Sequence, residues 1–168
     1  MNAAWRSIEP DKIKDNPFSL IGETWMLVTA GEEDSWNTMT ASWGGLGILW
    51  HKNVAFCFVR PTRHTYDFME KADKFTLSFF SEQYRKALNY CGSHSGRDVD
   101  KAKETGLTPV PVDSSIAFKE ARLVLVCQKI YSSDITPDNF LDKSIDKNYP
   151  LKDYHRCYIG EISSCYSE

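Results

Sequence analysis

The chain has 168 residues, of which 42% are hydrophobic and 26% are charged, and its formal net charge is −3. These values are ordinary for a globular protein, and the length predicts one domain covering residues 1–168. The slightly acidic balance, without a basic tail or patch, argues against a nucleic-acid partner.

No segment is typical of a secreted or membrane protein. The N-terminal sequence MNAAWRSIEPDKIKDNP has no basic region followed by an apolar run, so it does not resemble a secretory signal. The apolar run Val54–Val59 is far too short to span a bilayer. We therefore expect a soluble, cytoplasmic protein without a membrane partner.

Five cysteines are present, but they form no CxxC pair and have no short ligand spacing with the four histidines. We therefore predict no metal site and no disulfide framework. The thiols are interpreted as small buried hydrophobic groups.

Short β-prone segments predominate along the chain. Thr24–Thr29 and Asn37–Trp43, joined by the polar segment Gly31–Asp34, predict a hairpin. The glycines at positions 44, 45 and 47 then interrupt the strand pattern. Four more segments predict strands: Val54–Val59, Phe75–Phe80, Arg122–Tyr131 and Cys157–Ile162.

Helices are fewer and lie between the strands. Helical spacing predicts Thr65–Ala72, Glu82–Cys91 and Asp98–Thr105, and a fourth helix is expected to start near Pro137. Asp98 is placed to favour the start of the third helix. The prediction is mainly β with peripheral helices, arranged as a closed antiparallel barrel rather than a parallel α/β sheet.

Three segments carry candidate binding chemistry. The first is NTMTASWGG, Asn37–Gly45, in which a strand of small hydroxylated residues runs into glycines. Such a strand leaves backbone N–H and C=O groups accessible to the polar edge of a planar heterocycle. The alternative is an ordinary edge strand that ends in a loop.

The other two segments suit phosphate. RPTRHT, Arg60–Thr65, combines arginine forks and threonine hydroxyls with the start of a helix, although a solvated basic loop is the alternative. SHSGRDVDK, Ser93–Lys101, can form an anion nest around Gly96. The chain has neither GxGxxG after a strand nor a P-loop. Together the three segments predict a phosphorylated aromatic cofactor.

In this order, the segments resemble the flavin reductase-like, FMN-binding split-barrel family, which includes flavoredoxins. The resemblance runs from about Asn37 to Thr108 and resumes near His155–Ile162. It implies a split β-barrel that binds FMN. It also implies a homodimer, with FMN near the subunit interface.

The resemblance also implies site residues. The first segment would line the isoalloxazine ring, and the other two would hold the phosphate. The predicted cofactor-binding residues are Asn37, Thr38, Met39, Thr40, Ala41, Ser42 and Trp43 for the first segment, Arg60 and Thr65 for the second, and Ser95, Gly96, Arg97 and Lys101 for the third.

His155 is the predicted catalytic residue. Members of this superfamily often carry a Gly-Asp-His segment that is linked to use of the nicotinamide cofactor. This chain has Asp153, Tyr154 and His155 there, so it keeps the histidine without the preceding Gly-Asp. His155 could neutralise charge that develops at the N1–O2 edge of the flavin.

The favoured function is an oxidoreductase in which FMN accepts hydride from NADH or NADPH at N5 and passes electrons to a small-molecule or protein acceptor. The alternative is an FMN-binding electron-transfer or flavin-carrier protein without a nicotinamide site. A third possibility is a split-barrel protein for another ligand, such as haem or a deazaflavin.

Overall fold

The computed structural model describes residues 5–168. Residues 1–4, which belong to the N-terminal segment and to the predicted 1–168 domain, lie outside the described residues. Among the described residues, no helix combines the length and apolar character needed to cross a membrane.

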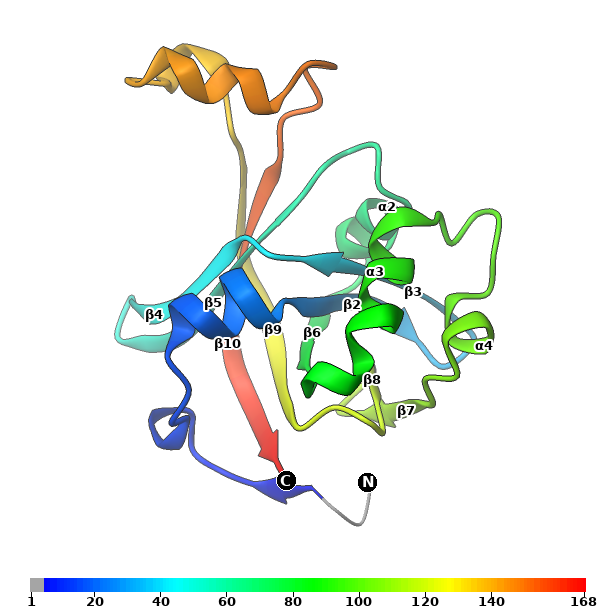
Figure 1. Cartoon of the computed structure of the whole chain (residues 1–168). Coiled ribbons are helices and arrows are strands. Elements are labelled where there is room, and N and C mark those ends of the chain that lie inside the picture. The colour runs from blue at the N-terminus through cyan, green and yellow to red at the C-terminus, as the bar shows by residue number, and fades with distance from the viewer. Residues whose placement is uncertain (1–4) are drawn as a thin grey trace.

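An antiparallel sheet of eight strands forms the centre of the molecule (Figure 1). Its strand order is β3-β2-β6-β9-β10-β5-β4, and β1 pairs with β10. The strands are β1 (Arg6–Ser7), β2 (Met26–Glu32), β3 (Ser35–Ala41), β4 (Gly44–Leu49), β5 (Lys52–Val59), β6 (Lys74–Phe79), β9 (Leu123–Asp134) and β10 (Arg156–Ser167).

The sheet curls so that β4, at one end of the strand order, lies against β2 near the other end. A Cβ atom on Gly44 would lie 3.1 Å from the Met26 methyl carbon and 3.7 Å from the Ile21 side chain. One apolar core, which includes Val28, Phe75 and Tyr158, packs inside this curl. The fold is therefore mainly β with peripheral helices, and the predicted split β-barrel is confirmed.

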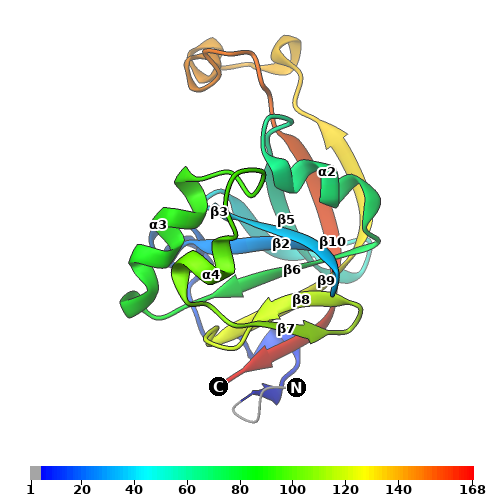
Figure 2. The ribbon, with the colours of Figure 1, turned by 90° about the vertical axis from the view of Figure 1, so that its right-hand side faces the viewer.

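Helices cover one side of the barrel, as Figure 2 shows for α2, α3 and α4. A second apolar cluster, which includes Leu88 of α3, Phe118 of β8 and Val124 of β9, packs there. The helices are α1 (Pro17–Ser19), α2 (His64–Lys71), α3 (Arg85–Ser93) and α4 (Lys101–Thr105), with a π-helical turn η2 (Leu20–Thr24) and 3-10 turns η1 (Pro10–Lys12), η3 (Glu82–Tyr84), η4 (Pro137–Asn139) and η5 (Lys143–Asn148).

Most predicted elements are present, with two instructive differences in position. The predicted hairpin forms β2 and β3, and Ser35–Ala41 ends two residues before Trp43. The third predicted helix begins later than Asp98, because Asp100 is the residue whose carboxylate accepts the backbone N–H of Lys103. Gly106 follows that helix with φ of 71°, as a left-handed helix end requires.

Two features were not expected from the sequence. The glycines at positions 44, 45 and 47 lie within β4, which pairs along its length with β5. A glycine is needed at position 44, since a Cβ there would lie 2.6 Å from the Phe56 carbonyl oxygen. A separate two-stranded sheet, β7 (Pro109–Val112) with β8 (Ser115–Phe118), was also not predicted.

Between β9 and β10 the chain forms a projecting arm, residues 135–154. Figure 1 shows this arm, coloured orange, extending away from the barrel. Leu141 and Leu151 of the arm are 100% and 78% exposed. Its base is fixed where the backbone N–H of Ile135 donates to the carbonyl of His155 at 2.9 Å.

The close approach at Gly44 predicts a stability difference between two neighbouring glycines. Gly44→Ala should lower the free energy of unfolding by about 1–3 kcal/mol, because its methyl group would overlap backbone. Gly45→Ala is the matched control, since its Cβ would meet only the Phe56 ring at 3.6 Å. Thermal unfolding of both variants is the measurement, and equal melting temperatures would contradict the packing at Gly44.

Candidate functional site

A cavity of about 170 Å³ opens where β3 ends and β4 begins. We call it the strand-end cavity. One wall is the end of the predicted heterocycle-binding segment, and the opposite side includes Phe58, Arg60 and His155. Its lining residues are Met39, Thr40, Ala41, Ser42, Trp43, Phe58, Arg60, Arg63 and His155.

A second cavity of about 150 Å³ lies between β3, the first turn of α2, and the loop from Ser93 to Lys101. We call it the loop cavity. It shares Met39 and Arg63 with the strand-end cavity, so the two hollows adjoin. Its lining residues are Asn37, Met39, Thr62, Arg63, His64, Thr65, Ser93, His94, Ser95, Gly96 and Lys101.

Lys101 is a buried cation in the loop cavity, with 6% of its surface exposed. Its ammonium donates to the carbonyls of Thr38 at 2.7 Å and Cys91 at 2.8 Å. Burial lowers the pKa of Lys101 to about 8. No carboxylate in residues 5–168 forms an ion pair with it, and an ammonium has three donors. Lys101 therefore retains charge and hydrogen-bonding capacity for an anion.

Three other predicted residues hold the loop cavity together. The Asn37 amide donates to the Thr65 hydroxyl at 2.8 Å, which joins β3 to the first turn of α2. Gly96 lies so close to Asn37 that a Cβ there would be 1.9 Å from the amide oxygen. Only glycine fits at this point, so the third segment packs its backbone directly on β3.

The two arginines of the second segment lie differently. Arg60 is engaged by the arm: it donates to Asp153 and to the carbonyl of Asn148, both at 2.9 Å. Arg63 lines both cavities and donates to the carbonyl of Gly92 at 2.8 Å. Arg63 lies in the phosphate-suited segment Arg60–Thr65 but is not among the predicted site residues.

Two predicted residues do not line either cavity. The hydroxyl of Thr38 points toward β2, where it meets the Thr29 hydroxyl at 2.8 Å, and only the backbone carbonyl of Thr38 takes part, through Lys101. Arg97 lies outside and pairs with Asp67 of α2 at 2.8 Å. The other predicted cofactor-binding residues and His155 all line one of the two cavities.

His155 forms the floor of the strand-end cavity beside Trp43, with the two ring centroids 5.2 Å apart. It is 8% exposed, and its Nδ1 atom lies 2.8 Å from the Tyr149 hydroxyl. Burial lowers the pKa of His155 to about 4, and the nearby positive charges of Arg60 and Arg63 act in the same direction. The imidazole is therefore neutral near pH 7.

Comparison with known families agrees with this geometry. The sequence pattern that defines the flavin reductase like domain family matches residues 18–167. The chain belongs to the flavin reductase-like domain family. The matched range includes both cavities and all the elements that line them.

Solved structures show the same fold at low sequence identity. The flavoredoxin of Desulfovibrio vulgaris (Miyazaki F) is 24% identical, with a TM-score of 0.67 over 86% of this chain and 69% of that one. The flavoredoxin from Methanosarcina acetivorans is 21% identical, with a TM-score of 0.70 over 96% and 76%. An FMN-binding protein from Thermus thermophilus is 20% identical, with a TM-score of 0.67 over 97% and 78%. No curated protein sequence matches the chain.

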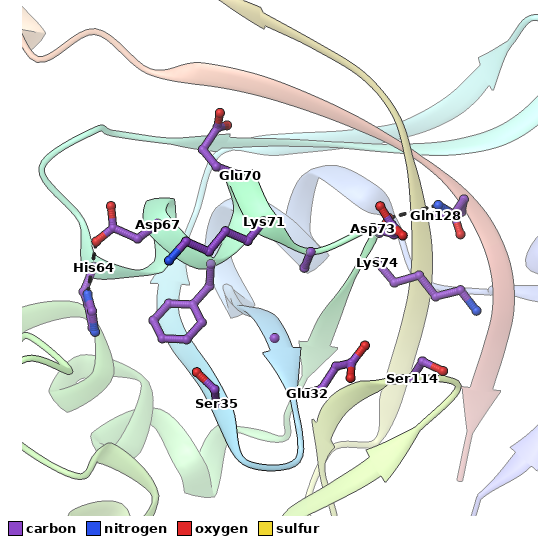
Figure 3. A pocket seen from close by; sticks show the side chains of 13 residues that line it. Glu32, Ser35, His64, Asp67, Glu70, Lys71, Asp73, Lys74, Ser114 and Gln128 are labelled. Atoms are coloured by element: carbon purple, nitrogen blue, oxygen red, sulfur yellow. Dashed lines mark hydrogen bonds and ion pairs between the residues drawn. The ribbon is translucent and has the colours of Figure 1, made fainter.

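A larger cavity, of about 870 Å³, lies along α2 and is shown in Figure 3. It meets the loop cavity only at His64. Two of its carboxylates are already paired, Asp67 with Arg97 and Glu70 with Arg156. Its lining includes four carboxylates and two lysines, so it offers no concentration of positive charge for a phosphate.

The buried state of His155 predicts a pH dependence. Between pH 6.5, its ordinary pKa, and about 4, the unfolded chain binds one more proton than the folded chain at this residue. Stability should therefore fall as the pH drops through this range, and His155→Gln should reduce that loss. An NMR titration of the His155 ring should give a midpoint near 4, whereas a midpoint near 6.5 would contradict its burial.

Proposed function

We propose that this member of the flavin reductase-like family is an FMN-dependent oxidoreductase that uses NADH or NADPH as its electron donor. The observation that carries the proposal is the adjoining pair of cavities. One offers a buried cation that has no anionic partner among residues 5–168, and the other offers strand backbone, an indole and a neutral imidazole.

The loop cavity suits a phosphate group. A dianionic phosphate would provide the third hydrogen-bond acceptor for Lys101 and would keep the ammonium charged. Arg63 and the first turn of α2 add positive potential on the adjacent side. Ser95 and the backbone at Gly96 face the same hollow, so the residues present fit the phosphate of FMN.

The strand-end cavity suits an aromatic ring system. Trp43 is 47% exposed, which leaves an indole surface available for a flat ligand. The segment from Thr40 to Ser42 lines the cavity at the end of β3. β3 is an edge strand and its pairing with β2 ends at Ala41, so some backbone N–H and C=O groups here have no strand partner. Bound here, the flavin supplies hydride and single-electron chemistry, while the protein binds and orients it.

His155 would act as a neutral hydrogen-bond partner for the polar edge of the ring. His155 would therefore stabilise negative charge at the flavin edge by donating a hydrogen bond, and it would not carry a positive charge of its own before the ligand binds. Arg60 and Arg63 supply positive charge near the same imidazole. An anionic ligand would raise the pKa of His155 from its low value, because it favours the protonated form.

We further propose that the protein functions as a homodimer that completes the flavin site. Together the two adjoining cavities, about 170 and 150 Å³, reach only the lower end of the usual 300–1,000 Å³ of a ligand site, so we infer that one chain leaves part of the flavin uncovered. The proposed contact uses exposed apolar side chains of the barrel and the arm, which are Trp43, Ile48, Trp50, Tyr131, Leu141 and Leu151.

The proposed activity is tested by the visible spectrum of the purified protein. A flavin band that bleaches when NADH or NADPH is added without air supports the oxidoreductase. A yellow protein that bleaches only with dithionite would instead support the electron-transfer or flavin-carrier alternative. The electron acceptor, a small molecule or a protein, is then found by adding candidates to the reduced protein.

The role of Lys101 predicts that FMN binds more tightly than riboflavin, by about tenfold or more, since a charge-assisted hydrogen bond is worth about 1.5–3 kcal/mol. Lys101→Met should abolish most of this preference. Lys103→Met, an exposed residue of the same helix with the same charge, is the control and should preserve it. Fluorescence titrations measure both affinities, and an unchanged preference in Lys101→Met would remove the phosphate from the loop cavity.

The dimer proposal predicts that light scattering gives twice the chain mass for the flavin-loaded protein. Leu151→Glu should weaken the dimer, because it replaces an apolar side chain of the arm, 78% exposed in the single chain, with a charged one. A monomer that binds one FMN tightly would show that one chain closes the site alone.

A further inference from the structure

The arm contacts His155 at its Nδ1 atom. Tyr149 of the arm is 3% exposed, and its hydroxyl is the partner of His155 Nδ1. Trp43 and Phe58, which line the strand-end cavity together with His155, lie against the imidazole, with ring centroids 5.2 and 6.4 Å away. The other ring nitrogen, Nε2, is the one that the arm leaves available.

The hydrogen-bonding capacity of these two side chains selects one arrangement of protons. A neutral imidazole has one N–H donor and one acceptor nitrogen. Burial raises the pKa of Tyr149, so the phenol keeps its proton. That proton is buried and needs an acceptor, and the partner found for the hydroxyl in residues 5–168 is His155 Nδ1. Nδ1 is then the acceptor, and the ring proton lies on Nε2.

Arg60 fixes the Tyr149 ring in this position. Its guanidinium carbon lies 4.9 Å from the centre of the ring, within the range of a cation–π contact. The same guanidinium is anchored by Asp153, which also accepts the Thr62 hydroxyl at 3.2 Å. Arg60 therefore joins the end of β5 to the arm, and its fork is used within the protein.

We propose that Tyr149 is a positioning residue that holds His155 as the Nε2–H tautomer, with its donor directed away from the arm, and that Arg60 secures this arrangement through Asp153 and the Tyr149 ring. The inference rests on the proposed flavin site, in which Nε2–H donates to the polar edge of the ring. It assigns Arg60 to the arm and leaves the phosphate to Lys101 and Arg63.

The tautomer is tested first in the wild-type protein without flavin. Nitrogen NMR of the labelled protein, with His155 identified by the loss of its signals in His155→Gln, should show a protonated Nε2 and an unprotonated Nδ1. A protonated Nδ1 would overturn the proposal. This measurement requires neither FMN binding nor a folded Tyr149 variant, so it separates failure of this inference from failure of the proposed function.

The consequence for the flavin is tested with Tyr149→Phe, which removes only the hydroxyl. Loss of the fixed donor should lower the preference for reduced over oxidised flavin by about tenfold, which is about 30 mV in a two-electron potential. Tyr154→Phe is the matched control, because its hydroxyl belongs to the same arm but donates to Asp146 at 2.7 Å. It should leave both tautomer and potential unchanged.

Two results with these variants would overturn the proposal. One is a Tyr149→Phe protein with the wild-type His155 tautomer and flavin potential. The other is an equal change in Tyr149→Phe and Tyr154→Phe, which would mean that the arm affects the flavin only through its overall stability.

Discussion

The buried ammonium of Lys101 is the interaction on which the rest of the site depends. It bonds to the backbone carbonyls of Thr38 in β3 and Cys91 in α3, so one charge joins the edge of the barrel to its helical cover. Burying a cation without an opposite charge is costly, and the low pKa of Lys101 reflects that cost. An anion in the adjoining loop cavity would remove it. Fold and ligand are thus linked at one side chain.

From this point the site extends in two directions. Toward α2, Asn37 bonds to Thr65 and contacts Gly96, so the helix start and the loop meet β3 beside the loop cavity. Toward the end of β3, Arg63 leads to the strand-end cavity, where Trp43 and His155 face the ligand space. The arm then supports His155 from behind through Tyr149. A flat ring at one end and a phosphate at the other match this layout, and the family membership of the chain agrees with it.

The sequence predicted the barrel, and most of the predicted site residues lie together at the two cavities, because the relevant signals are local. The alternation over Asn37–Trp43, the helix predicted from Thr65 and the loop around Gly96 can each be recognised within a few residues. Strand β4 was missed because the need for glycine at position 44 comes from residues distant in the sequence. The Phe56 carbonyl and the Met26 side chain, which belong to other strands, leave no room for a Cβ there. The role of Arg60 was hidden for the same reason, because Asp153 is 93 residues from Arg60 along the chain. The Thr38 hydroxyl was placed wrongly for a similar reason, because it bonds to the hydroxyl of its strand partner Thr29 and does not line either cavity.

The central claim is that Lys101 receives the phosphate of FMN, and proton uptake on binding tests it most directly. At pH 8, near the pKa of Lys101, about half of the free protein molecules should have a protonated Lys101. A bound phosphate dianion should cause the other half to take up a proton at Lys101. Calorimetric titrations in buffers of different ionisation enthalpy should therefore show uptake of about half a proton with FMN and almost none with riboflavin. Equal uptake with the two ligands, or none with FMN, would contradict the account.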